Sequence, residues 1–429
     1  MIEPDIALAE NLFVRLRELS FDGVGITRDT YGDGEQKAHD LIASTGAELG
    51  LELRLDEALN LYITLPGKDR NTPIIMTGSH LDSVPRGGNY DGAAGVIAGI
   101  SILSGLVKAN VQHLRDITVI AVRAEESAWF PVSYIGSKSA FGLLNREALF
   151  VKRSDTQRTL FDHLKSFGGN PESLISGKAA LSPEKINCFI ELHIEQGPVL
   201  VGKDSVLGVV TGICGSQRYR EAQIIGKYAH SGATPRLHRQ DAVVALATLI
   251  DKLQHAWQAM EAAGHELTLT FGQVNTDLQQ ADFSKVSGLV SLSIDIRSQD
   301  LNTLAEMDRR IMEVSTEVEQ ICGVQFLPGP KSGSQPALMN TTLQQALCDA
   351  AIQNGVQPHM MPSGAGHDAS IFANQGIPTA MLFVRNSNGS HNPEEAMEMS
   401  DFAIAIRTLA EVIIARAGER FSRGPRTQG

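Results

Sequence analysis

The sequence has few cysteines, more acidic than basic residues and no long apolar run. Only 4 of its 429 residues are cysteine, and no two form a CxxC pair, which favours free thiols in a reducing compartment over a disulfide framework. Lysine and arginine total 37 against 49 acidic residues, giving a formal net charge of -12. A nucleic acid or an anionic membrane is therefore not expected as a partner.

No apolar stretch approaches the length of a membrane span, and the start, MIEPDIALAENLF, lacks the basic-then-apolar pattern of a secretion signal. We therefore expect a cytoplasmic protein whose main partner is a small molecule. What the chain does contain is an ordinary globular composition, with 42% hydrophobic and 20% charged residues. Its length exceeds what one core usually supports, so two domains are expected.

The first part of the chain alternates helical periodicity with short apolar runs, which predicts an α/β sheet covered by helices on both faces. In such sheets ligands bind beyond the carboxyl ends of the strands. The predicted elements are helices at 6–19, 35–49 and 92–107 and strands at 61–65, 74–78 and 117–122.

A second block of different character begins near Ile213 and resembles a small sheet with two helices. The predicted domains are therefore a catalytic domain at 1–212 and 331–429, interrupted by an inserted α+β domain at 213–330. The polar tail from Gly418 onward is expected to be frayed. Within these limits we predict strands at 219–226, 267–274, 291–297 and 380–384, helices at 241–262, 301–321, 343–354 and 401–417, and turns at 327–336.

Polar residues gather where the predicted strand at 74–78 runs out, in TGSHLDSVPRGGNYDGAAG (77–95). One interpretation makes His80 a metal ligand, Asp82 its orienting partner and Asp91 a carboxylate able to bridge two ions. The alternative makes Asp91 a helix N-cap and His80 a turn residue. For either residue alone the alternative is the commoner case, but it does not explain why other such residues recur at the same sheet edge.

Glu125 and Glu126 follow the apolar strand at 117–122. Adjacent carboxylates at a buried edge are costly unless cations neutralise them. On extended backbone their side chains would point in opposite directions, so that one Glu could bind metal while the other takes a proton from water. The alternative is a pair of acids on a solvated helix start.

Two further histidines complete the set. His193 lies in the strand-like CFIELHIEQGP (188–198), where Gln196 follows it, and His391 lies in the loop of FVRNSNGSHNPEEAM (383–397). Each alone is more often a core or solvated histidine. Together with the carboxylates they form the ligand inventory of a two-metal hydrolytic site, and the mixed nitrogen and oxygen ligands suit Zn²⁺, Mn²⁺, Co²⁺ or Ni²⁺.

The order of these motifs resembles the hydantoinase/carbamoylase family of M20-type metalloamidases, over about 12–416. This family includes allantoate amidohydrolases, N-carbamoyl-L-amino-acid hydrolases and β-ureidopropionases. The resemblance implies a di-metal aminopeptidase-like catalytic domain with an inserted lid and dimerisation domain. Its motifs here are GSHLDSVPRGGNYDG, AEES (124–127), ELHIEQGPVL, AHSGATP (229–235), SGAGHDA (363–369) and SHNP (390–393).

The resemblance also implies roles for the candidate residues. Asp91 would bridge two divalent ions, Glu125 would be the general base and Asp82 would orient His80. The ligands would be His80 and His193 for one ion, and Glu126 and His391 for the other.

The inserted domain would complete the substrate site in a homodimer. The resemblance implies that His230 polarises the scissile carbonyl from the partner subunit and that Arg297 holds the substrate carboxylate, a task its planar fork suits. Gln196 and the SGAGHDA loop would line the pocket, with Gly364 and Gly366 allowing close backbone approach. From periodicity alone, Arg297 would be a surface strand residue.

This chain departs from the family pattern in the inserted domain. FSKVSG (283–288) stands where many members have Asn-x-Val/Ile-Pro-Gly, so Ser284 occupies the position of a substrate-contacting Asn. The family's GQRRY appears as GSQRY (215–219), and Arg236 replaces a frequent Met. The departures concern substrate choice rather than the hydrolytic core.

The function expected from the residues and the resemblance is hydrolysis of a linear amide or ureido C–N bond in a carboxylate-bearing substrate. An N-carbamoyl amino acid, giving the amino acid, ammonia and carbon dioxide, is the first expectation. The alternatives are an allantoate amidohydrolase and an N-acyl-amino-acid amidase or dipeptidase. A binding protein without catalysis is a further alternative, against which the complete set of ligands and base argues.

Overall fold

The structure is a computed structural model that describes residues 3–418, and the predicted frayed tail lies largely outside these residues. The chain forms two compact units. The first comprises Met1–Thr211, Met339–Ser363 and His367–Gly429, and the second comprises Gly212–Leu338 and Gly364–Gly366. No helix among the described residues is long and apolar enough to cross a membrane.

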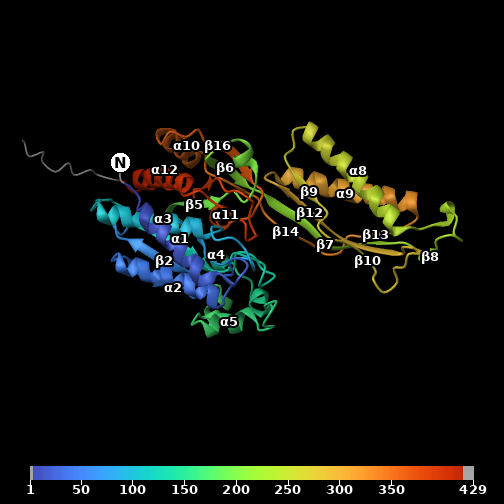
Figure 1. Cartoon of the computed structure of the whole chain (residues 1–429), viewed down its shortest axis with the longest axis horizontal. Helices are drawn as coiled ribbons and strands as arrows, with labels where there is room; N and C mark the ends of the chain where they lie inside the picture. The colour runs from blue at the N-terminus through green and yellow to red at the C-terminus, as the bar shows by residue number, and fades with distance from the viewer. Residues whose placement is uncertain (1–2, 419–429) are drawn as a thin grey trace, which may run out of the picture. The chain divides into compact units, whose positions relative to one another are not determined.

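The first unit is an α/β structure built on one large sheet (Figure 1). Its helices are α1 (Ile6–Ser20), α2 (Asp33–Glu48), α3 (Ala93–Lys108), α4 (Ile135–Ala140), α5 (Leu160–Ser166), α6 (Pro171–Ile175), α7 (Val199–Gly202), α10 (Thr341–Gln353), α11 (Ala369–Asn374) and α12 (Met399–Ala417). Its strands are β1 (Glu52–Leu55), β2 (Leu61–Leu65), β3 (Ile74–His80), β4 (Ile117–Val122), β5 (Ile186–Ile194), β6 (Leu207–Ile213), β16 (His359–Ser363) and β17 (Thr379–Val384).

The strand order in this sheet is β1-β2-β4-β3-β5-β17-β6, with β16 also pairing with β6. The central strands β4, β3, β5 and β17 are parallel, so their carboxyl ends lie at one edge. Helices α1, α2, α3, α10 and α12 share one apolar core with the sheet. On the other face, Phe189 of β5 stacks on Phe372 of α11 with ring centroids 3.9 Å apart. The predicted sheet with helices on both faces is confirmed.

Small residues let α3 lie directly against the strands. Nearly every residue of this helix is buried, as expected for a helix that is apolar all round. A Cβ added at Gly95 would lie 2.4 Å from the carbonyl oxygen of Leu192 in β5 and 2.7 Å from Cβ of Ser79 in β3. Glycine is therefore needed there, and it fixes the start of α3 beside the ends of β3 and β5.

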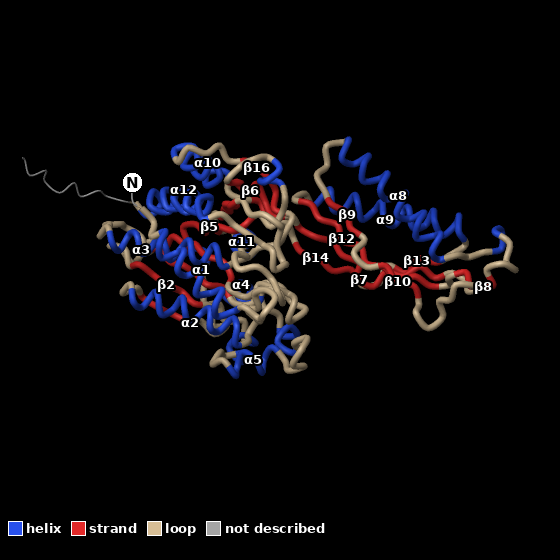
Figure 2. The backbone as a smooth tube through the Cα atoms, viewed as in Figure 1, coloured by secondary structure: helices blue, strands red, loops and turns tan. Residues whose placement is uncertain are grey.

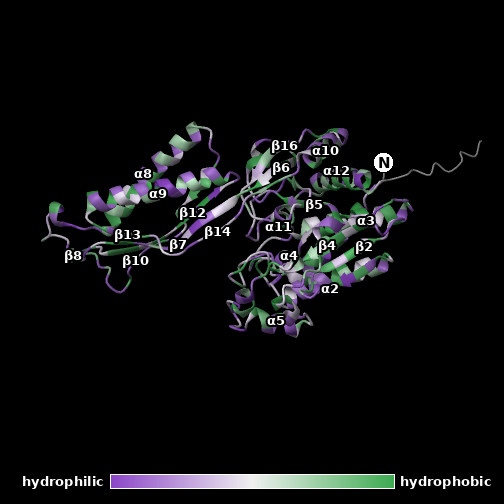
Figure 3. Cartoon of the chain, turned by 180° about the vertical axis from the view of Figure 1, so that it is seen from behind, coloured by the Kyte–Doolittle hydropathy of each residue, from purple (hydrophilic) through white to green (hydrophobic). Residues whose placement is uncertain are grey.

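The second unit is an α+β structure in which α8 and α9 lie side by side on one face of an antiparallel sheet (Figure 2). Its strand order is β10-β12-β7-β13, with β14 on β7 and β9 on β12, and β8 pairs separately with β11. Both polar and apolar stretches appear along α8 and α9 in Figure 3, the pattern of helices with one buried face. The elements are β7 (Gly215–Ile225), β8 (Ala229–His230), α8 (Ala242–Ala262), β9 (Thr268–Thr270), β10 (Val274–Thr276), β11 (Lys285–Val286), β12 (Leu289–Ser298), α9 (Leu301–Cys322), β13 (Gln325–Leu327), β14 (Lys331–Ser334) and β15 (Ala337–Leu338).

Two predictions of local structure are wrong. The segment at 327–336 was expected to be turns, but Lys331–Ser334 forms β14, an exposed strand paired with β7. Its composition, KSGS, carries no apolar alternation because neither face is buried. The single strand expected at 267–274 is instead two short strands, β9 and β10, separated around Gly272, the residue type that weakens a strand interior.

Candidate metal centre

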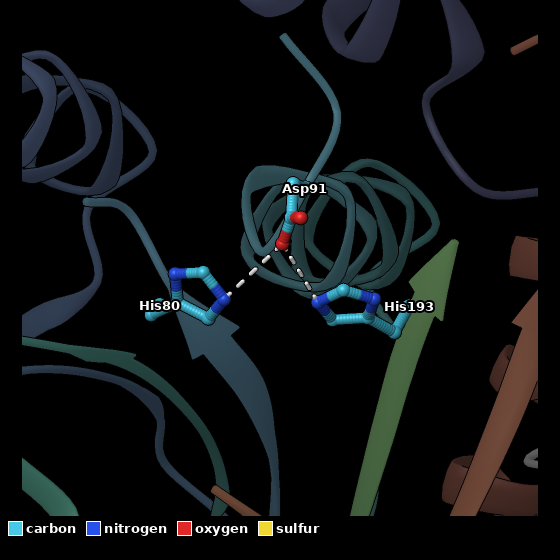
Figure 4. A group of neighbouring side chains, drawn as sticks. All are labelled: His80, Asp91 and His193. Atoms are coloured by element: carbon cyan, nitrogen blue, oxygen red, sulfur yellow. Dashed lines mark ion pairs between the residues drawn. The ribbon is translucent and has the colours of Figure 1, made fainter. Parts of the chain in front are cut away.

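The candidate site lies at the carboxyl ends of β3 and β5 and at the start of α3. His80 is the last residue of β3, and His193 is the penultimate residue of β5; both are buried. Asp91 precedes α3, whose N-cap is Gly92. The N-cap interpretation of Asp91 is therefore wrong, because its carboxylate makes no cap bond and turns to the two imidazoles instead (Figure 4).

One oxygen of Asp91 serves the first group of ligands. The Nε2 atom of His80 lies 3.5 Å from Asp91 Oδ1, and the Nε2 atom of His193 lies 3.3 Å from the same oxygen. The other oxygen serves a second group, since His391 Nε2 lies 3.5 Å from Asp91 Oδ2 and 3.3 Å from Oε1 of Glu126. A carboxylate shared in this way is suited to bridging two cations.

The hydrogen bonds of the imidazoles identify which nitrogen of each ring faces Asp91. His193 Nδ1 lies 2.9 Å from the carbonyl oxygen of Ile194, and the backbone N–H of Gly92 donates to its Nε2 at 3.1 Å. His80 Nδ1 lies 3.1 Å from the carbonyl oxygen of Asp82. In its neutral form each ring therefore carries its proton on Nδ1 and turns Nε2 toward Asp91, where the Nε2 of His193 also accepts from Gly92.

These contacts test whether a metal fits the site. Lone pairs of two buried imidazoles converge on a carboxylate oxygen, which is unfavourable unless a positive charge lies between them. Although burial favours the neutral ring, the contacts with Asp82 and Asp91 raise the pKa of His80 well above its ordinary value, and Asp91 raises the pKa of His193. The negative charge of these carboxylates, which would keep the imidazoles protonated, also favours divalent cations. The residues therefore fit a metal site.

Gly92 is required by the close approach of His80. Its φ is +66°, a conformation that favours glycine, and an added Cβ would lie 2.5 Å from Nδ1 of the His80 ring. The glycine therefore allows the imidazole to reach Asp91.

Asp82 organises both sides of the site. Its buried carboxylate faces His80 Nδ1 at 3.3 Å and accepts hydrogen bonds from the backbone N–H groups of Glu125 and Glu126, at 3.1 and 3.2 Å. Thr30 Oγ1 donates to it at 2.6 Å. One carboxylate thus fixes the orientation of a histidine and the position of the two glutamates.

The two glutamates reach different atoms, but not for the reason expected. The segment that carries them is not extended, because Ala124 has a left-handed φ of +58° and β4 has already ended at Val122. From this turn, Glu126 lies against His391, while Glu125 Oε2 lies 4.0 Å from His80 Nε2. Burial and the neighbouring carboxylates raise the pKa of Glu125 well above its ordinary range.

Left-handed backbone at non-glycine residues recurs around the site. Gln196 has φ +64° and His391 has φ +62°, in addition to Ala124. Such conformations cost free energy and persist where surrounding contacts impose them, often at functional sites. Gln196 is held by the side chain of Asn386, which accepts from its backbone N–H at 3.0 Å.

Sequence reasoning missed several groups that hold Asp91. Gln196, predicted as a pocket residue, donates from Nε2 to Asp91 Oδ2 at 2.8 Å, and Ser390 Oγ donates to the same oxygen at 2.5 Å. The Ser390 hydroxyl oxygen also lies 2.7 Å from Oε2 of Glu395, and Glu395 accepts from the backbone N–H of Asp91. The adjacency of Ser390 to His391 was the available signal, whereas nothing in the sequence marked Glu395.

A third group of potential ligands uses His193 with Glu191 and His367. Its carboxylate is already occupied, because Glu191 accepts from Ser79 Oγ at 2.6 Å and from the backbone N–H of Ala369 at 2.8 Å. Both oxygens of Glu191 accept such bonds, whereas in Asp91 the bonds from Gln196 and Ser390 reach Oδ2 alone, so Oδ1, with His80 and His193, is the stronger candidate.

The remaining predicted residues lie in the second unit. His230 ends the short strand β8 and is exposed, and its Nδ1 accepts from the backbone N–H groups of Gly232 and Ala233 at 3.2 and 3.1 Å. The neutral ring therefore carries its proton on Nε2 and can donate it. Ser284 lies beside this strand, since its carbonyl accepts from Ser231, but its hydroxyl donates to Asp282 at 2.7 Å.

Arg297 is oriented by two acceptors. Its Nε donates to Asp295 at 3.0 Å, and its Nη1 donates to the carbonyl oxygen of Gly364 at 2.7 Å. The structure thus brings Arg297 and Gly364 together. A Cβ at Gly364 would meet no protein atom within 4 Å, so the close approach of a substrate to this backbone stays a prediction.

Comparisons with known proteins decide the family. The family described as peptidase family M20/M25/M40 matches residues 76–415. The chain belongs to this family.

Two of the proteins to which this M20-family chain is similar are named amidohydrolases. It is 32% identical to the allantoate amidohydrolase of Escherichia coli strain K12, over 92% of this chain and 94% of that protein. It is also 32% identical to the N-carbamoyl-L-amino acid amidohydrolase of Geobacillus stearothermophilus, over 94% and 97%. The crystal structure of a hydantoinase/carbamoylase family amidase from Burkholderia multivorans matches with a TM-score of 0.87 and 26% identity, over 97% and 98% of the two chains. The predicted family and its α/β fold are confirmed.

Proposed function

We propose that this protein is a metal-dependent amidohydrolase that cleaves a linear ureido C–N bond, with an N-carbamoyl amino acid as substrate. The products are the amino acid, ammonia and carbon dioxide. The single observation that carries the proposal is the division of the Asp91 carboxylate between two ligand groups. The similarity to named amidohydrolases over nearly the whole chain supports the bond type.

Five side chains would hold two divalent ions, Zn²⁺, Mn²⁺, Co²⁺ or Ni²⁺. When bound, the ions supply Lewis acidity toward water and the scissile carbonyl. The assignment is His80 and His193 to one ion, Glu126 and His391 to the other, and Asp91 to both.

Glu125 is the proposed general base. It is mostly buried, does not belong to either ligand group, and lies beside His80. A carboxyl with a raised pKa is suited to accept a proton from the attacking water and then return it to the departing nitrogen. Asp82 keeps this glutamate in place through its backbone N–H.

The second unit would supply substrate contacts. His230 presents a free Nε2–H group that can donate to the developing oxyanion, as a residue of the partner subunit in a homodimer. Arg297 would bind the substrate carboxylate with its guanidinium fork, already oriented by Asp295 and Gly364. All four cysteines are free, which agrees with the proposed cytoplasmic location.

Allantoate is the second candidate substrate, because the relative named for it is as similar as the one named for N-carbamoyl amino acids. A substrate panel decides between them. Metal-stripped enzyme reloaded with a single metal would be tested for ammonia release from N-carbamoyl amino acids, N-carbamoyl-β-alanine and allantoate, and for release of the free amino acid from N-acetyl amino acids and dipeptides. The proposal expects the highest kcat/KM for an N-carbamoyl amino acid. A preference for allantoate supports the alternative, and cleavage of dipeptides alone contradicts both.

A further inference from the structure

Arg28 lies behind the connection between β3 and α3, outside every motif that pointed to the site. Its side chain is fully buried. The guanidinium donates from Nε to the carbonyl oxygen of Leu81 at 2.6 Å, from Nη1 to Oδ1 of Asn89 at 3.4 Å and from Nη2 to the carbonyl oxygen of Asp91 at 3.4 Å. One side chain thus spans the connection from Leu81, its first residue, to Asp91, the residue before the N-cap of α3.

The main chain at Arg28 holds the same connection. The backbone N–H of Arg28 donates to Ser83 Oγ at 2.9 Å, and the backbone N–H of Ser83 donates to the carbonyl oxygen of Arg28 at 2.9 Å. Two residues on, Thr30 donates to Asp82. The segment 28–30 therefore supports both acidic residues of the connection, the orienting Asp82 and the bridging Asp91.

The charge of Arg28 is unusual for a buried arginine. Among the described residues no carboxylate forms a direct ion pair with it, and its acceptors are carbonyl and amide oxygens. Burying an unpaired charge is costly unless a field of opposite sign surrounds it. Burial lowers the pKa of the Arg28 guanidinium, and the nearby carboxylates of Glu395, Asp91, Asp82 and Glu126 oppose this effect by favouring the charged form.

A planar guanidinium that donates to three acceptors fixes their positions relative to one another, which the compact ammonium group of a lysine cannot do. Fixing Leu81, Asn89 and Asp91 relative to one another fixes where the connection turns, and therefore where the Asp91 carboxylate points. Because the two oxygens of Asp91 belong to different ligand groups, a shift of its backbone would disturb both groups together.

We propose that Arg28 is a positioning residue for the metal centre, whose guanidinium fork sets the backbone of Asp91 so that its carboxylate serves both ion sites. This inference rests on the proposed two-ion site. It concerns the affinity of the site for metal and is separate from the identity of the substrate.

The test uses Arg28→Lys, which keeps the charge but not the fork, and Arg28→Met, which removes both. Arg153→Met is the matched control. Arg153 is equally buried and binds Asp29, the neighbour of Arg28, but has no bond to the connection. Zn²⁺ affinity and stoichiometry would be measured by calorimetry on the full-length, metal-stripped proteins, together with the Tm of each metal-free variant.

Both Arg28 variants are expected to bind Zn²⁺ about 10- to 100-fold more weakly at both sites, the usual effect of removing a group that orients metal ligands. Arg153→Met should lower Tm but bind Zn²⁺ as the parent does. Wild-type affinity in Arg28→Lys would show that only charge matters and would overturn the proposal. Wild-type affinity in both variants with a lowered Tm would reduce Arg28 to a structural role and overturn it as well. If the parent itself binds none of Zn²⁺, Mn²⁺, Co²⁺ and Ni²⁺, the proposed function fails instead.

Discussion

The candidate residues of the two units differ in how firmly the fold holds them. In the first unit His80, Asp82, Asp91 and His193 are all buried and each is fixed by several neighbours. In the second unit His230 and Ser284 are exposed, and Arg297 is half-buried. The difference teaches that the proposed reaction centre is built into a core, where its geometry is imposed, whereas the proposed substrate contacts lie on the surface, where sequence can change at little cost in stability.

If the buried centre performs the chemistry, its base should show the largest effect. Glu125→Gln keeps the size of the side chain but cannot accept a proton. We expect kcat to fall about 10²- to 10⁴-fold, measured by ammonia release, while metal content by elemental analysis is unchanged. Near-normal turnover would contradict the assignment of the base.

The shared carboxylate should matter more for metal binding than any residue that serves one group. Asp91→Ala is expected to lose both ions, whereas His391→Ala should lose one, because His391 belongs only to the second group. Elemental analysis after dialysis measures the content. Equal losses in the two variants would show that Asp91 does not bridge.

The surface residues should affect substrate binding rather than the metal. Arg297→Lys keeps the charge and loses the fork, so KM should rise about 10-fold, as expected for losing one charge-assisted hydrogen bond, with metal content unchanged. Arg218→Lys is the control, because Arg218 also binds Asp295 but was not assigned to substrate. A larger effect at Arg218 would contradict the role of Arg297.

His391 is the exposed member of the buried centre, and it should give the smallest effect. In the metal-free protein, the hydrogen bond with Glu126 raises the pKa of His391 to about 9 from 6.5. Because the pKa is raised on folding, the stabilisation from this contact is fully present below pH 6.5 and is lost as pH rises through 9. The Tm difference between the metal-free parent and His391→Gln should follow this course, and NMR of the His391 ring checks the pKa directly. Titration near 6.5 would show that the contact with Glu126 does not form.

Much of the large sheet was predictable from short stretches of the sequence. The apolar runs at 61–65, 74–78 and 117–122 predicted β2, β3 and β4 closely, because strands buried in a sheet consist of such runs. The ends of these strands then indicated where His80 and the glutamates would lie.

The contacts that hold the centre together were not predictable from the sequence. Gln196 and Ser390 reach Asp91 from loops with left-handed residues, and no periodicity reports loop conformation. Arg28 and Glu395 are far from Asp91 along the chain. Their roles depend on tertiary packing, which residue types alone do not encode. In the same way, β14 was missed because an exposed edge strand needs no apolar pattern.

The most direct test of the central claim is the location of bound metal. Crystals of the protein grown with Mn²⁺ would be measured for anomalous scattering. The account predicts two peaks per subunit, one between Asp91, His80 and His193 and the other between Asp91, Glu126 and His391. A single peak at Glu191, His193 and His367, or no peak beside Asp91, would contradict it.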